Sequence, residues 1–310
     1  MRVSGAFCPA GISSFFEICN VDSSGHPLAD PARIGSRGGG LAIARGATSR
    51  AIVRKSGVTR IRVKINSKPA PGARTTRSAI EQLLKTQGIT LDVGIEVKVA
   101  SPIGAGFGTS AAGTLASCLA VSDAADITVT MNELGRITHV AEVVNRTGLG
   151  TAAALLTGGF VLVKEPGAPG IGLVDRLLFP RNHCIICAYV GPIPTQDALA
   201  KVEVAARVNA FAKRTMDAVL KNPTLSTFLA ESRKFGQEAG FETTTVTRLI
   251  STMIANGAAG AAQNMIGEAV HGVANNRKVG TIVNSVKKTF PAAKVFAAPL
   301  DNQGVRLLGK

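Results

Sequence analysis

The chain of 310 residues has few aromatic side chains: it contains no Trp and one Tyr, and aromatics make up 4% of a sequence that is 45% hydrophobic. Its core must therefore be built from Ala, Val, Ile and Leu, and its length suffices for one large domain or two ordinary ones. No run of 18 apolar residues and no apolar N-terminal stretch occurs, which argues against a membrane span and a signal peptide. The cysteines are odd in number and lack the spacing of a disulfide framework, so we expect a reducing, cytoplasmic location: Cys8, Cys19, Cys118, Cys184 and Cys187.

Acidic residues are missing from one long segment. Between Asp30 and Glu81 there is none, whereas twelve Arg or Lys residues occur there, and the net charge of the chain is +15. Such a block indicates either an anionic partner or a solvated basic face. Nucleic acid is the less favoured partner, because no aromatic residue lies between Phe16 and Phe107 to stack on bases and no helix-turn-helix or zinc-finger pattern is present.

The pattern of apolar residues and turn signals predicts strands and helices in both halves of the chain. This mixture indicates an α+β protein with two domains, which comprise residues 1–180 and 181–310. The first half is predicted to hold a hairpin (49–66), a helix (77–87), a strand (91–99), a helix (109–122), a helix from the capping box Thr130–Glu133 to Arg146, a strand (158–163) and a Pro/Gly-rich connection (164–182). The second half is predicted to hold a strand (184–190), mainly helices (195–275) and short strands (293–298, 304–308).

Three alternate glycines, Gly104, Gly106 and Gly108, stand between the predicted strand 91–99 and the predicted helix 109–122. A Walker loop would need a Gly-Lys-Ser/Thr ending, and the dinucleotide fingerprint would need a glycine at Thr109. Protein-kinase motifs are also missing. What remains is either a glycine-rich turn with a Thr cap or an anion site, in which free backbone N–H groups and the helix dipole face a phosphate. In the second case the Ser110 hydroxyl would be a Mg²⁺ ligand.

The segment Pro102–Ala112 resembles the P-x-x-x-G-L-G-S-S-A-A phosphate loop of the GHMP kinases, and further similar segments lie at 15–18, 35–40, 141–150 and 166–170. The resemblance implies a two-domain fold with an N-terminal domain like domain 2 of ribosomal protein S5 and a smaller α+β domain behind it. It also implies an ATP-dependent enzyme that phosphorylates a hydroxyl of a small molecule, with Mg²⁺ held by Ser110 and Glu142. The residues that would bind ATP are Pro102, Gly104, Ala105, Gly106, Phe107, Gly108, Thr109, Ser110 and Ala111.

The resemblance places the acceptor, a small acid, beside the segment 35–40, with Arg37 pairing with its carboxylate; Ser36, Gly38 and Ser13 complete this group. Two positions depart from the family pattern. Gly11 stands where the family usually has a basic residue or His, and Thr151 stands where an Asp would accept the hydroxyl proton. The catalytic positions are thus Ser110, Glu142 and, without an assigned base, Thr151.

Other interpretations stay open at this level. The acceptor is a choice among small hydroxy acids, including mevalonate derivatives and homoserine, and a non-catalytic protein that binds a ligand or nucleic acid is the alternative class. Cys184 and Cys187 form a single C-x-x-C in an apolar strand, which favours core packing over zinc. His139 and Glu142 lie one helical turn apart, which suits a metal pair or an ordinary helix face. A homodimer is compatible with the sequence, which fixes no oligomeric state.

Overall fold

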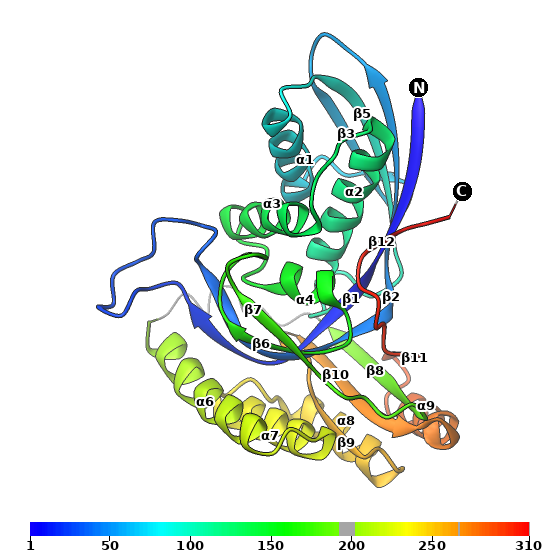
Figure 1. Cartoon of the computed structure of the whole chain (residues 1–310). Helices are drawn as coiled ribbons and strands as arrows, with labels where there is room; N and C mark the ends of the chain where they lie inside the picture. Colours follow the sequence, from blue (N-terminus) through cyan, green and yellow to red (C-terminus); the bar gives the residue numbers. More distant parts are fainter. Residues whose placement is uncertain (192–201, 266, 310) are drawn as a thin grey trace.

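The computed structural model describes residues 1–191, 202–265 and 267–309, which form two sheets flanked by helices (Figure 1). The elements of the first part are β1 (Arg2–Cys19), β2 (Gly35–Lys55), β3 (Arg60–Ile65), β4 (Lys68–Pro69), α1 (Arg74–Thr86), β5 (Leu91–Val99), α2 (Thr109–Ala125), α3 (Met131–Val144), α4 (Thr151–Thr157), β6 (Phe160–Glu165) and β7 (Leu173–Leu177). Those that follow are β8 (His183–Gly191), α6 (Val202–Lys221), α7 (Leu225–Glu238), α8 (Thr244–Ala255), β9 (Gly260–Gln263), β10 (Glu268–Asn275), a 3₁₀ turn (Asn276–Lys278), α9 (Val279–Thr289), β11 (Lys294–Ala298) and β12 (Arg306–Leu307).

The first sheet has the strand order β12-β1-β2-β5-β3-β4, and β6 pairs with β2 and with β7. Its two longest strands, β1 and β2, run antiparallel over almost their whole lengths, from Arg2 opposite Val53 to Cys19 opposite Gly35. Alternation of apolar and polar residues in β5 turns Val93, Ile95 and Val97 to the buried face. That face is covered by α1, α2 and α3.

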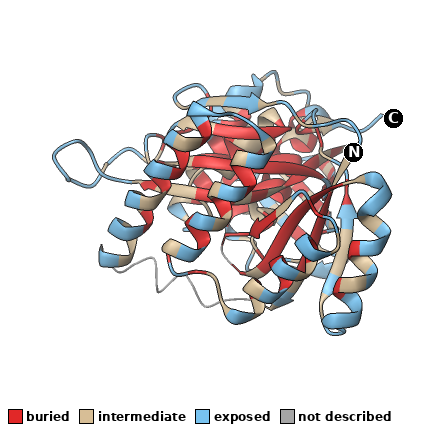
Figure 2. Cartoon of the chain, turned by 90° about the horizontal axis from the view of Figure 1, so that it is seen from below, coloured by how far each residue is buried: buried red, intermediate tan, exposed pale blue. Residues whose placement is uncertain are grey.

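Helix α2 lies at the centre of this packing. Its sequence is rich in Ala, Gly and Ser, and it is buried from Ala111 to Cys118 without interruption. Small side chains let its backbone approach β1 and β2 closely, so the helix that follows the glycine loop is a fixed part of the core. Figure 2 shows the same distribution, with buried residues gathered in the sheets and in the faces of the helices that cover them.

The second sheet has the order β11-β8-β10-β9, with α8 and α9 packed against it. A further apolar cluster joins the two sheets through α6 and α7, and it includes Phe15, Phe160, Phe228 and Phe235. The Phe160 and Phe228 rings lie edge to face at 4.6 Å between centroids. The few aromatic residues of the chain are thus concentrated where the two layers meet.

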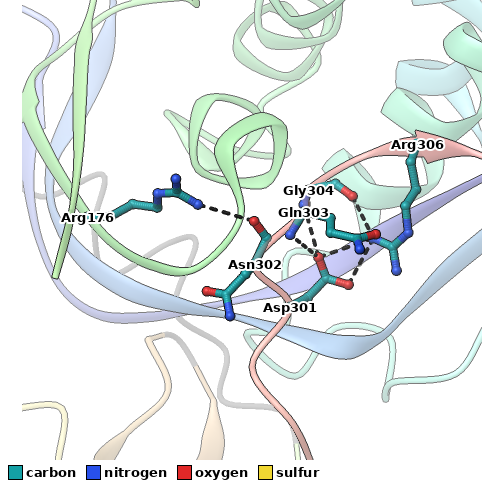
Figure 3. A network of polar contacts seen from close by, with 6 residues as sticks. All are labelled: Arg176, Asp301, Asn302, Gln303, Gly304 and Arg306. Atoms are coloured by element: carbon teal, nitrogen blue, oxygen red, sulfur yellow. Dashed lines mark hydrogen bonds and ion pairs between the residues drawn. The ribbon is translucent and has the colours of Figure 1, made fainter. Parts of the chain in front are cut away.

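The last strand returns to the first sheet, where β12 pairs with β1 (Figure 1). The turn before it is held by the nearly buried carboxylate of Asp301, which accepts hydrogen bonds from the Gln303 and Gly304 amides and from Arg306 (Figure 3). The Val305 amide donates to the Leu155 carbonyl at 3.1 Å, so this turn supports the end of α4. The division at residue 180 stays a prediction.

The α+β fold class is confirmed, but several expected elements differ. The predicted hairpin 49–66 is wrong: β5 lies between β2 and β3, antiparallel to the first and parallel to the second. The connection 164–182 contains β7, and residues 260–263 and 268–275 form β9 and β10 rather than helix. Helix α9 and the long strand β1 were not predicted, and residues 195–201 of the expected helical region lie outside the described residues. Among the helices of the described part, none has the length and apolarity of a membrane span.

Candidate active site

The glycine loop between β5 and α2 alternates buried anchors with glycines in left-handed conformation. Ala105 and Phe107 are 0% and 1% exposed. Gly104, Gly106 and Gly108 have φ values of 74°, 74° and 56°, a region that L-residues rarely adopt. The anchors fix the loop to the core between the sheets, while the glycines permit the backbone to turn at every second residue. The alternation in the sequence therefore reflects the conformation of the loop.

Contacts from outside the loop hold both of its ends. The Gly11 amide donates to the Phe107 carbonyl at 3.0 Å, and the Phe107 ring lies 5.6 Å from the Phe296 ring. Arg45 stacks on that second ring at 4.6 Å and donates from Nε to the Ala100 carbonyl at 3.0 Å. Strands from both sheets thus fix the loop that follows β5.

Helix α2 begins immediately after the loop, with Gly108 as its N-cap and Thr109 and Ser110 in its first turn. This first turn has no acidic residue and no side-chain cap, so no side chain of the helix itself caps its free amide groups at the positive end of the helix dipole. Such a terminus stabilises an anion, and the adjoining glycine backbone lets a phosphate come close.

Glu142 is the buried carboxylate of the site, with 2% of its surface exposed. Burial raises its pKa to about 7, opposed by the nearby Ser110 and Thr147 hydroxyls. Thr147 Oγ1 donates to Oε1 at 3.3 Å, whereas Oε2 is buried and has no hydrogen-bond partner within the described structure. The structure therefore brings together Ser110 and Glu142, which lie 32 positions apart in the sequence.

These two residues fit a Mg²⁺ ion. An unpartnered buried carboxylate oxygen is costly unless a cation or proton satisfies it, and the Ser110 hydroxyl beside it offers a further oxygen. Within the described residues, no group of three or more His, Cys, Asp or Glu side chains is suited to a metal. A site with few protein ligands is typical of Mg²⁺ that is shared with substrate phosphates and water.

Gly11 and Thr151 meet at the other side of the same loop. A Cβ placed on Gly108 would lie 2.6 Å from Thr151 Cγ2 and 3.3 Å from the Gly11 carbonyl oxygen. Thr151 is the first residue of α4 and is partly exposed. No carboxylate takes its place from the neighbouring sequence, since none occurs between Glu142 and Glu165.

The residues expected to bind the acceptor lie on β1 and β2, and their roles stay predictions. A Cβ on Gly150 would lie 2.6 Å from Ser36 Oγ, which places Ser36 next to the start of α4. Arg37 is ion-paired with Glu17 at 3.1 Å and donates to the Lys164 carbonyl at 2.9 Å, so two of its nitrogens already have partners. Gly38 lies against the Phe15 carbonyl, where a side chain would collide.

Ser13 is linked to the second sheet by a different contact: its carbonyl accepts a hydrogen bond from the Met265 amide at 2.9 Å. The next residue, Ser14, shares a buried network with His271, whose Nε2 lies 3.0 Å from Ser14 Oγ and whose Nδ1 lies 2.8 Å from Asn264 Oδ1. Burial lowers the pKa of His271 to about 3, so the ring is neutral and joins the two sheets beside Ser13.

The other candidate side chains are either packed in the core or exposed to solvent. His139 Nε2 lies 2.7 Å from the Ile34 carbonyl, and burial lowers its pKa. Cys187 is fully buried in β8, and burial raises the pKa of both it and Cys184, which suits packing rather than metal binding. Most cations of the segment without acids are exposed on β2, β3 and β4, so they form a solvated basic face: Arg50, Arg54, Lys55, Arg60, Arg62, Lys64 and Lys68.

Sequence reasoning missed three contributors to the site. Arg45 supports the loop through Phe296, and Thr75 and Thr147 form a chain of hydroxyls that ends on Glu142. No local pattern marks Arg45, which is one of many basic residues, or Thr75, which lies in a different helical region from Glu142. Thr147 lies in the segment 141–150 that resembles the family, but no role was predicted for it. Only the tertiary contact reveals them.

The fold and the loop define the class of protein. Residues 74–159 match the GHMP kinases N terminal domain, and the chain has the GHMP kinase fold. This confirms the family resemblance of the Pro102–Ala112 segment.

Particular relatives narrow the comparison. A pantoate kinase from Thermococcus kodakarensis is 28% identical over 240 residues, which cover 76% of this chain and 75% of that protein. One from Methanocaldococcus jannaschii is 26% identical over 264 residues, 84% of this chain and 89% of that protein. A solved structure described as a phosphotransferase related to the CoA biosynthesis pathway has a TM-score of 0.87 and 22% identity, and the match covers 98% of both chains. Within the family the sequence segments also resemble archaeal pantoate kinases most, and these relatives confirm that resemblance.

Proposed function

We propose that the protein is an ATP-dependent pantoate kinase, which phosphorylates pantoate to 4-phosphopantoate in coenzyme A biosynthesis of the archaeal type. The observation that carries the proposal is the meeting of Ser110, at the start of α2, with the buried Glu142 carboxylate beside a glycine loop. The similarity to pantoate kinases selects the acceptor among small hydroxy acids. A cytoplasmic location, expected from the cysteine content, belongs to the same proposal.

Different residues would bind the nucleotide, the metal and the acceptor. The loop backbone and the first turn of α2 would bind the ATP phosphates, and Ser110 and Glu142 would hold Mg²⁺, which neutralises charge on the phosphate oxygens. Ser13, Ser36, Arg37 and Gly38 would orient the acceptor near the start of α4. Positioning and electrostatics carry most of a phosphoryl transfer, so the site remains competent although Thr151 offers no strong base.

Incubation of the purified protein with ATP, Mg²⁺ and a panel of pantoate, mevalonate, mevalonate phosphates and homoserine tests the proposal. We expect ADP and a phosphorylated product when pantoate is the acceptor, and no turnover with the other acceptors of the panel. Turnover of another acceptor would reassign the substrate, and nucleotide binding without turnover of any of them would indicate a non-catalytic protein. Ser110→Ala and Glu142→Ala should each depress the activity strongly, and near-normal rates in both would contradict the metal assignment.

A further inference from the structure

Glu142 is held by Thr147, which follows the end of α3, the helix that carries Glu142. Helix α3 ends at Val144, and Arg146 adopts a left-handed conformation with φ 56°, which reverses the chain. As a result the Thr147 amide donates to the Glu142 carbonyl at 2.9 Å, and Thr147 Oγ1 donates to Glu142 Oε1 at 3.3 Å. Backbone and side chain of one threonine therefore fix both ends of the glutamate.

A second threonine, from α1, orients the first. Thr75 is buried in the first turn of α1, and its Oγ1 lies 3.0 Å from Thr147 Oγ1. A hydroxyl has one proton to donate, and the carboxylate Oε1 accepts that of Thr147. Thr75 must therefore be the donor to Thr147, which gives the chain of hydroxyls one direction, from α1 to the carboxylate.

The chain of hydroxyls determines which carboxylate oxygen stays free. With Oε1 occupied by Thr147, the unpartnered buried oxygen is Oε2. Gly148 leaves room for it, because a Cβ at that position would lie 2.7 Å from Oε2. We propose that Thr75 and Thr147 are positioning residues that present Glu142 Oε2 to Mg²⁺ in the nucleotide site. This inference rests on the proposed function, since it concerns the same metal.

Helix α1 also supplies a matched control. The next residue, Thr76, pairs with Thr114 of α2 through hydroxyls 2.9 Å apart, and both are buried. Thr76→Val removes a hydroxyl pair of the same type and length from the same helix turn, but one that does not lead to Glu142. Asn145, the C-cap of α3, donates to Ser78 of α1 at 3.0 Å, and we expect this contact to keep the helices docked when Thr75 is replaced.

The experiment measures binding of a non-hydrolysable ATP analogue by calorimetry, with Mg²⁺ and with EDTA, to the wild type and to the Thr75→Val, Thr147→Val and Thr76→Val variants. The ratio of the two affinities reports the metal alone. We expect it to fall by about 10-fold in Thr147→Val and in Thr75→Val, which is the low end of the effect of groups that orient a metal ligand. Thr75→Ser and Thr147→Ser should restore it, and Thr76→Val should leave it unchanged.

Because the two threonines act in series, the Thr75→Val/Thr147→Val double variant should bind no more weakly than Thr147→Val alone. Equal losses in Thr75→Val and Thr76→Val, or wild-type ratios in both Thr75→Val and Thr147→Val, would overturn the inference while leaving the kinase proposal intact. A ratio near one in the wild type, together with no turnover, would instead overturn both. Thr147 is exposed, so its valine variant keeps the test valid even if Thr75→Val does not fold.

Discussion

Gly11 and Thr151 are spatial neighbours: a Cβ added to Gly11 would lie 3.3 Å from Thr151 Cγ2 and 3.0 Å from Leu155 Cδ2. The two positions at which the chain departs from the family pattern therefore lie next to each other in the structure. The threonine methyl and the leucine leave little room for a side chain at position 11, so a basic residue there would require Leu155 to shift.

Replacing Thr151 with Asp tests whether this place can supply the proton acceptor. We expect Thr151→Asp to raise kcat by about 10²-fold, the low end of the contribution of a general base. Thr151→Asn, which has the same shape without the charge, is the control and should leave kcat at or below the wild-type value. An unchanged kcat in the Asp variant would mean that another group accepts the proton.

Filling the space beside Glu142 tests whether the position of its carboxylate matters for activity. Gly148→Ala would place a methyl group 2.7 Å from Oε2 and displace the carboxylate, so we expect kcat to fall by about 10-fold or more. Gly280→Ala in α9, where an added Cβ meets nothing within 4 Å, is the control and should keep its activity. Steady-state kinetics with ATP and pantoate measure both, and equal rates in the two variants would contradict the assigned geometry.

The buried Glu142 carboxyl predicts a pH-dependent stability in the absence of metal. Its pKa is about 7 in the folded protein against 4.5 ordinarily, so between these values the folded state retains a proton that the unfolded state has released. The stabilisation is complete below pH 4.5 and is lost as the pH rises through 7, a change of about 3 kcal/mol.

Denaturant unfolding of the wild type and of Glu142→Gln at pH 5 and pH 8 measures this effect. His271, whose pKa is lowered to about 3, acts with the opposite sign, since its contribution is lost as the pH falls. The difference between the two proteins cancels that contribution. Relative to Glu142→Gln, the wild type should lose stability from pH 5 to pH 8, and a constant difference would show that Glu142 is ionised throughout.

Substitutions in the turn at Asp301 should lower the unfolding free energy more than substitutions of exposed ion pairs. Asp301→Asn removes the charge that Arg306 pairs with at 2.9 Å and replaces an acceptor with a donor near the Gly304 amide, at a cost of about 2–4 kcal/mol. Asp175→Asn, which loses only an exposed pair with Lys164, should cost about 0–1 kcal/mol. Equal losses in unfolding free energy would contradict the role given to this turn.

How far the sequence predicted the structure depended on how local each signal was. The glycine loop and the cap at Thr130 were predictable, because alternate glycines and a capping box specify the conformation of adjacent residues. The hairpin at Ser56-Gly57 was not, because the turn signal is local whereas the choice of β5 as the partner of both strands is made by the whole sheet. The same reason hid Thr75, whose contact with Thr147 joins residues 72 positions apart.

The pairing of β12 with β1 has a consequence for the order of biosynthesis. A ribosome delivers β1 first and residues 301–307 last among the described strands, yet the Val305 amide and the Asp301 turn support the end of α4, the helix that begins at Thr151. The nascent chain can assemble α2 against β1 and β2 early. The end of α4 acquires this support only when β12 has emerged, so we expect acquisition of activity to follow the emergence of that strand.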